Sequence, residues 1–217
     1  MDNHQWLEMW ERAEIGFHLD GTHPLLVRHW PSMQAPDGAR VLVPLCGKTR
    51  DMLFLRSQGC AVTGIELSGI AIRQFFEEQQ LAPRQAPFGA LESFEIDGVR
   101  LIEGDFFAVE PGQLGPMDLV YDRAALIAMP PDRQPRYAEH LMALAGGAPI
   151  LLITLDYNPA EMNGPPFATP PAQIERLFGD RYRIECLESA EVLAENPGLR
   201  NRGLSALTEA TWRLEPR

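Results

Sequence analysis

The sequence predicts an α/β fold: a doubly wound, mostly parallel sheet of seven strands, in one domain over residues 1–217. The apolar, β-branched run at 40–43 stops at Pro44 and is followed by Gly47, which is typical of a buried parallel strand that breaks into a tight loop. Strand-like and helical segments then alternate along the chain. Near the end, apolar and polar residues alternate, which predicts an antiparallel C-terminal strand on the otherwise parallel sheet.

The individual elements follow from the same patterns. Parallel strands are expected at 40–44, 61–66, 99–103, 117–121 and 149–155, and helices near 49–58, 69–80, 133–145 and 171–178. Residues 182–187 and 206–214 are expected to form an antiparallel edge pair joined by a long hairpin. Residues 82–98 are interpreted as an insertion without an assigned structure.

The N-terminal part of the chain is predicted to be helical and to precede the sheet. Its aromatic residues are too widely spaced for one clean helix face, and a second short helix is expected over residues 24–30. A Pro-Asp-Gly turn begins at Pro36. We therefore expect residues 1–36 to form a helical flap over an α/β core of residues 37–217.

Composition limits the possible functions. The formal net charge of -11, without a basic block, disfavours nucleic acid as a partner. Three cysteines without metal-ligand spacing predict neither a disulfide framework nor a metal site, and they fit a reducing, cytoplasmic location. The polar N-terminus and the absence of a long apolar run disfavour export and membrane insertion. The expected partner is a small molecule, and the expected state is a monomer.

An acid at the end of the second strand indicates a nucleoside-bearing cofactor. Glu66 follows the first strand–loop junction at about the spacing at which such a carboxylate binds the hydroxyls of a ribose. The junction contains no G-x-G-x-x-G, so nothing there is suited to a pyrophosphate. S-adenosyl-L-methionine is therefore the leading candidate. An ordinary solvated acid is the alternative for Glu66.

Six short motifs, in order over essentially the whole chain, resemble the thiopurine S-methyltransferase family, in particular its bacterial members. They are Trp10 with GFH at 16–18, LVPLCGK at 42–48, GIELS at 64–68, GDFF at 104–107, YDRAAL at 121–126 and GPPF at 164–167. The resemblance implies a class I, Rossmann-like methyltransferase that transfers a methyl group from S-adenosyl-L-methionine to the sulfur of an aromatic or heterocyclic thiol. Bacterial members are also associated with selenium and tellurium species.

The resemblance assigns cofactor contacts to Trp10, Leu45, Glu66 and Arg123. Gly47 would permit close approach of the backbone to the cofactor. A plain strand–helix connection is the alternative reading of that loop.

The ends of the third and fourth predicted strands carry further candidates. Asp105 is placed to reach an adenine, and Phe106 or Phe107 to stack on it, with at least one of the two rings in the core. Arg123 is expected near the cofactor and the acceptor, where a guanidinium would favour thiolate over thiol and act in catalysis. A salt bridge to the adjacent Asp122 is the alternative.

Aromatic residues ahead of the sheet are candidates for the flap side of the site. An aromatic face attracts a sulfonium cation, so Trp10 is assigned to the cofactor and Phe17 to the acceptor. Core packing is the alternative for both. Cys46 has no visible partner base and is interpreted as a packing residue, while His18 and His23 are left unassigned.

Other functions stay open on the sequence alone. A nicotinamide-dependent oxidoreductase would also use a strand-end acid but lacks its glycine fingerprint here. A non-catalytic cofactor-binding module would keep Glu66 without needing an acceptor pocket. A methyltransferase for halides or for selenium and tellurium species would share the fold and the donor.

Overall fold

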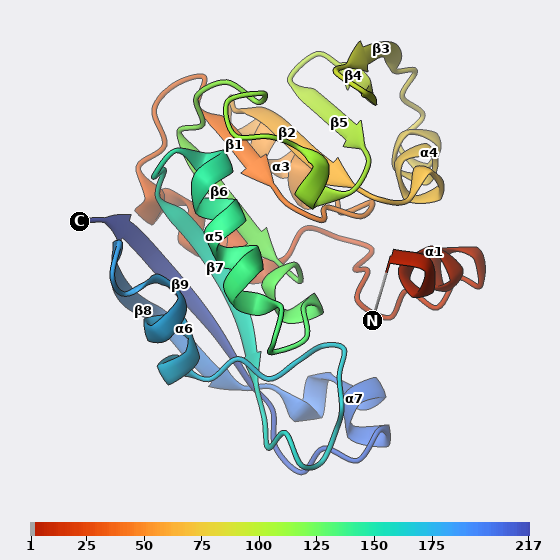
Figure 1. The fold of residues 1–217 in the computed structure, drawn as a ribbon. Helices are drawn as coiled ribbons and strands as arrows, with labels where there is room; N and C mark the ends of the chain where they lie inside the picture. The colour runs from red at the N-terminus through yellow and green to blue at the C-terminus, as the bar shows by residue number, and fades with distance from the viewer. Residues whose placement is uncertain (1–2) are drawn as a thin grey trace.

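The computed structural model describes residues 3–217, and over these residues the strands form one nine-stranded sheet. The strand order is β3-β4-β5-β2-β1-β6-β7-β9-β8. The strands are β1 (Arg40–Val43), β2 (Ala61–Glu66), β3 (Arg84–Phe88), β4 (Leu91–Ile96), β5 (Val99–Glu103), β6 (Leu119–Arg123), β7 (Ile150–Asp156), β8 (Tyr182–Glu191) and β9 (Thr208–Pro216). Figure 1 shows β3 and β8 at opposite ends of this sheet.

The centre of the sheet is parallel, as the sequence predicts. β1 pairs in parallel with β2 and β6, β2 with β5, and β6 with β7. The C-terminal strand β9 runs antiparallel to both β7 and β8. Because β9 lies between β7 and β8, only β8 of the expected C-terminal edge pair is an edge strand. The five parallel strands therefore end at one common edge.

The prediction of seven strands is wrong, because the insertion at 82–98 forms two more. β3 and β4 make an antiparallel hairpin that extends the sheet beyond β5. Pro87 lies in β3, the outermost strand of that hairpin, where a missing backbone donor is tolerated. Most of β3 is exposed, so it lacks the apolar alternation on which strand prediction depends.

Helices cover both faces of the sheet. They are α1 (Asn3–Glu11), α2 (Pro24–His29), α3 (Asp51–Ser57), α4 (Gly69–Glu78), α5 (Gln134–Ala145), α6 (Pro171–Phe178) and α7 (Pro197–Asn201). Short 3-10 turns are found at Trp30–Met33, Phe106–Ala108, Leu126–Ala128 and Leu193–Glu195. Ser68 caps α4, where its Oγ accepts the N–H of Ala71 at 3.3 Å.

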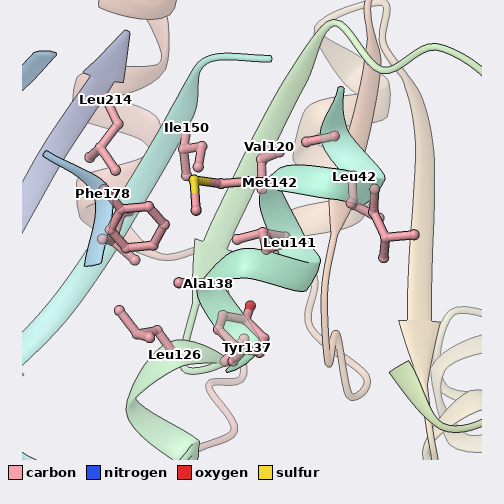
Figure 2. Close-up of a cluster of buried hydrophobic side chains, with 14 of the residues drawn as sticks. Leu42, Val120, Leu126, Tyr137, Ala138, Leu141, Met142, Ile150, Phe178 and Leu214 are labelled. Atoms are coloured by element: carbon pink, nitrogen blue, oxygen red, sulfur yellow. The ribbon is translucent and has the colours of Figure 1, made fainter. Parts of the chain in front are cut away.

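The core consists of two main apolar clusters, one on each face of the sheet. In one, strand residues such as Val120 and Ile150 pack against Leu141 of α5 and Phe178 of α6 (Figure 2). In the other, Tyr121 and the alternate residues of β1, β2 and β7 pack against α2, α3 and α4. Adjacent strand residues thus enter opposite clusters, which is the pattern of strands buried on both faces.

The N-terminal segment is only partly separate from this core. Leu26 is fully buried and Trp30 is 5% exposed, and both belong to the cluster under α2 and α3. The helix α1 lies outside that cluster, beside α4 (Figure 1). The proposed division into a flap of 1–36 and a core stays a prediction, and residues 1 and 2 lie outside the described part. No helix among the described residues is long and apolar enough to cross a bilayer.

Candidate active site

A cavity of about 640 Å³ lies at the edge where the parallel strands end. Every residue that the sequence analysis assigned to the site lines this cavity. These residues are Trp10, Phe17, Leu45, Gly47, Glu66, Asp105, Phe106 and Arg123. A sheet with parallel strands collects strand ends at one edge, so residues far apart in the chain meet there.

The loop after β1 bends back over the end of β2. Leu45 and Gly47 both adopt positive φ, +45° and +53°, and the N–H of Cys46 donates to the carbonyl of Ile65 at 3.0 Å. A Cβ added to Gly47 would lie 3.3 Å from the ring of Trp10. A glycine at position 47 therefore permits the left-handed backbone conformation and also leaves space for the Trp10 ring of the N-terminal segment.

Glu66 holds this loop in place. Its Oε2 accepts the N–H of Gly47 at 2.8 Å and its Oε1 accepts the N–H of Ser68 at 2.7 Å. The side chain is buried, and burial raises the pKa of its carboxyl, although the backbone N–H groups partly oppose this effect. The N–H of Leu67 also acts on this carboxylate, whose roughly four lone-pair sites still leave acceptor capacity for a donor in the cavity.

Asp105 connects the end of β5 to α1. Its Oδ1 accepts the N–H of Phe107 at 2.9 Å, and its Oδ2 accepts a hydrogen bond from Nδ2 of Asn3 at 2.9 Å. The Phe106 ring is 4% exposed and lies 5.1 Å from the ring of Tyr137, so it packs in the core. Phe107 is less buried and lines the same cavity. Stacking on an adenine stays a prediction for either ring.

Arg123 does not pair with Asp122. The Asp122 carboxylate accepts the Tyr137 hydroxyl at 2.8 Å and the N–H of Leu126 at 3.2 Å, on the α5 face of the sheet. On the other face, Nη2 of Arg123 donates to the carbonyl of Phe17 at 2.9 Å. Arg123 makes no ion pair within the described part of the chain, and its guanidinium is thus a cavity-lining cation without a carboxylate partner there.

Aromatic rings of the N-terminal segment cover this part of the cavity. Phe17 lies between two tryptophans, with ring centroids 5.9 Å from Trp6 and 5.8 Å from Trp10 in edge-to-face geometry. The Phe17 backbone binds Arg123 at the same time. The predicted acceptor residue and the predicted catalytic residue are therefore in direct contact.

Cys46 and His18 have no assigned chemistry here. A Cβ at Gly64 would lie 2.6 Å from Sγ of Cys46, so the thiol fills the space that the glycine leaves. Burial and the Glu66 carboxylate raise the pKa of that thiol well above its ordinary value, which agrees with a packing role. The pKa of His18 is lowered, first by burial and then by Lys48.

Two loops that sequence reasoning treated only lightly complete the far wall. Pro165 and Pro166 line the cavity, and Arg202 donates from Nη1 to the Pro165 carbonyl at 2.7 Å. The Tyr157 hydroxyl donates to the Pro166 carbonyl at 2.6 Å. Residues of the β8–β9 connection, among them Pro197, also line it. The GPPF motif was a signal for the first loop, whereas nothing in the sequence indicated the second.

Four polar side chains on the cavity wall were also missed. His23 is the N-cap residue of α2, and Asp51 begins α3. Tyr121 lies in β6 and Glu209 in β9. His23 was noticed without an assigned role, Tyr121 begins the YDRAAL motif but was given no role, and Asp51 and Glu209 carry no local motif. Their meeting depends on the order of strands in the sheet, which a single sequence does not specify.

The strand order, with the antiparallel strand β9 between β7 and β8, is that of the class I methyltransferase fold. A solved structure of a SAM-dependent methyltransferase from Anabaena variabilis has the same fold, with a TM-score of 0.63 at 14% identity over 99% of this chain and 95% of that one. A second is Burkholderia thailandensis 1,6-didemethyltoxoflavin-N1-methyltransferase with bound S-adenosylhomocysteine, with a TM-score of 0.61 at 16% identity over 98% and 87%.

The chain belongs to the thiopurine S-methyltransferase family, whose family model matches residues 1–217. A relative named thiopurine S-methyltransferase, from Nitrosospira multiformis, is 45% identical over 218 aligned residues, which cover 100% of this chain and 99% of the relative. The protein is therefore a methyltransferase, and its methyl donor is S-adenosyl-L-methionine. The family, fold class and cofactor expected from the sequence are confirmed.

Proposed function

We propose that this protein methylates the sulfur of small aromatic or heterocyclic thiols of the thiopurine type by direct in-line displacement. The observation that carries the proposal is the position of Arg123. Its guanidinium lines the cavity, is held by the Phe17 carbonyl and has no carboxylate partner among the described residues. A cation in that position favours the thiolate form of a bound acceptor.

The residues present fit the donor. The buried Glu66 carboxylate has lone pairs for ribose hydroxyls. Gly47 leaves room that a Cβ would fill, and the Trp10 ring, of a kind that attracts a cation, borders that space. When bound, S-adenosyl-L-methionine supplies an activated methyl group on a sulfonium sulfur.

The chain's own contribution is positioning and the exclusion of water. Phe17, Met129, Leu155 and Pro165 give the acceptor side of the cavity apolar walls, and low water content strengthens the attraction between Arg123 and a thiolate. A thiolate is already a strong nucleophile, so alignment of the reacting atoms supplies most of the acceleration. The proposed site therefore needs no nucleophilic triad.

A screen of acceptors tests this function. Purified protein would be incubated with methyl-labelled donor and with heterocyclic thiols, thiophenols, selenium and tellurium oxyanions, or halides, and methylated products would be measured by mass spectrometry. We expect aromatic and heterocyclic thiols to give the highest kcat/KM. Turnover of oxyanions or halides without turnover of any thiol would contradict the proposal. Binding of labelled nicotinamide dinucleotide in place of the donor would contradict it as well.

We also propose that the protein acts as a cytoplasmic monomer. Cys46, Cys60 and Cys186 are free thiols, which suits a reducing compartment. Light scattering of the active enzyme should give the mass of one chain. Activity confined to a larger species would contradict the monomer.

A further inference from the structure

Glu209 is a carboxylate on the cavity wall that the site described so far does not use. It lies in β9, lines the cavity and has a side chain that is 23% exposed. Its one ion pair in the described structure is with His23, whose Nε2 lies 3.4 Å from Oε1, and its charge also acts on the nearby Tyr121 hydroxyl. The carboxylate therefore has capacity for a further hydrogen bond from the cavity.

The strand register places Glu209 on the same face of the sheet as Arg123. Arg123 is opposite Ile153 of β7, and Glu209 is opposite Leu155 of the same strand. Residues two apart in a strand point to the same face, so Arg123, Ile153, Leu155 and Glu209 share one face. The strands β6 and β9 flank β7, which puts them about 10 Å apart. A cation and a carboxylate thus face one cavity across the width of one strand.

Hydrogen bonds around His23 fix the role of the imidazole. Its Nδ1 accepts the N–H of Leu25 at 3.3 Å, where it caps α2. Nδ1 therefore carries no proton, and the neutral ring carries its proton on Nε2, toward Glu209. The backbone N–H of His23 is anchored on Oδ1 of Asp51 at 2.7 Å, and Oδ2 of Asp51 accepts the Tyr121 hydroxyl at 2.9 Å. In this tautomer the Nε2–H of His23 lies on the side of Glu209, 3.4 Å from its Oε1, and the carboxylate is the member of the pair with lone pairs free to accept a proton.

We propose that Glu209 is a second catalytic residue, which accepts the ring N–H proton of a heterocyclic thione while the exocyclic sulfur is methylated. This inference rests on the proposed function and concerns those of its acceptors that are thiones with an N–H beside the C=S group. Such a molecule has its acidic proton on nitrogen, so a cation near sulfur alone does not remove it.

The reaction balances without any further reagent. A C=S electron pair forms the new bond from sulfur to the methyl carbon, and the bond between that carbon and the donor sulfur breaks with its pair going to the donor sulfur. The N–H pair becomes the C=N bond, and the proton moves to the Glu209 carboxylate. Arg123 stabilises the negative charge that develops on the acceptor sulfur.

Two acceptors that differ in the ring N–H separate this role from a structural one. Pyridine-2-thione carries the N–H beside C=S, whereas thiophenol carries its proton on sulfur. At neutral pH, Glu209→Gln should lower kcat/KM for pyridine-2-thione by about 100-fold, in the range for a lost general base, and for thiophenol by less than about threefold. Glu209→Asp, which keeps a carboxylate, should retain more pyridine-2-thione activity than Glu209→Gln.

The controls keep the test independent of folding. Glu215→Gln changes a carboxylate on the same strand that pairs with Arg183 and Arg213 away from the cavity, and it should leave both acceptors unaffected. Calorimetry with S-adenosylhomocysteine should give the wild-type affinity for Glu209→Gln. An equal loss of kcat/KM for both acceptors, or no loss for either, would overturn the role of Glu209 and leave the proposed function standing. If the wild-type enzyme methylates neither acceptor, the proposed function fails as well.

Discussion

Asp122 and Arg123 are adjacent in the chain, yet their side chains serve opposite faces of β6. Asp122 binds the Tyr137 hydroxyl at 2.8 Å inside the α5 core, and Arg123 binds the Phe17 carbonyl at the cavity. Alternation along the strand excludes the salt bridge between them that the sequence allowed. One strand end therefore supplies a structural acid and a candidate catalytic cation.

Replacing Arg123 should impair turnover more than donor binding. Without the cation the bound thiol has a higher pKa, so Arg123→Met should lower turnover at neutral pH by about 10- to 100-fold. Part of the loss should be recovered as pH rises toward the free thiol's own pKa.

The pH dependence of turnover, recorded for one acidic aromatic thiol and one weakly acidic aliphatic thiol, measures this recovery. Arg73→Met, on the exposed side of α4, is the matched control; a defect that is the same at every pH and for both thiols would exclude the thiolate role.

Asp122 should make stability depend on pH in an unusual direction. Burial raises the pKa of its carboxyl to about 6 from the ordinary 3.8, against the effect of the Tyr137 hydrogen bond. The folded state then binds more protons than the unfolded state between these values, so this group's contribution to stability falls as pH rises from about 4 to about 6 and stays low above that.

The neutral replacement Asp122→Asn should remove this dependence. Relative to wild type, the variant's free energy of unfolding should increase between pH 4 and pH 7 by on the order of 3 kcal/mol, since one pKa unit corresponds to about 1.4 kcal/mol. Urea unfolding of both proteins across this range gives the difference. Parallel stability curves for the two proteins would show that Asp122 does not titrate there.

Glu66 should determine the affinity for the donor. Charge-assisted hydrogen bonds contribute roughly 1.5 to 3 kcal/mol each, so Glu66→Gln should weaken S-adenosylhomocysteine binding about 10- to 100-fold in calorimetry. Burial raises the pKa of this carboxyl above 4.5. As the pH is lowered, the affinity of the wild-type protein for S-adenosylhomocysteine should therefore begin to fall at a higher pH than it would if Glu66 were an exposed glutamate. Glu103, the register partner of Glu66 on β5, does not line the cavity and offers a control as Glu103→Gln. Unchanged affinity in Glu66→Gln would remove Glu66 from the donor site.

The sequence predicted the parts of the site that depend on local pattern. A strand that ends in a tight loop and a strand that ends in an acid place Gly47 and Glu66 at one edge in any parallel sheet. Glu209 is different, because it reaches the cavity only through the insertion of β9 between β7 and β8. That order is a long-range property of packing, and no spacing in the chain encodes it.

The predicted number of strands, seven, was wrong for a related reason. In β4, Phe94 and Ile96 alternate with polar residues, and Gly89 lies in the turn, so a hairpin signal was present. Pro87 and the exposed surface of β3 masked it. Edge strands bury little apolar surface, so their sequences carry the weakest signal.

The N-terminal segment should respond to ligand in its first half only. Residues 3–19 are held on the body by contacts around the cavity: Asn3 to Asp105, Trp10 against Gly47, and the Phe17 carbonyl to Arg123. Residues 24–33 are anchored differently, because Leu26 and Trp30 are buried in the core.

Hydrogen exchange should therefore slow across 3–19 when S-adenosylhomocysteine and a thiol are added, and should change little across 24–33. Equal protection of 3–19 with and without ligands would make α1 a permanent part of the fold and Trp10 a packing residue. Slowing over the whole of 3–33 would instead mean that the flap extends through α2 despite its buried residues.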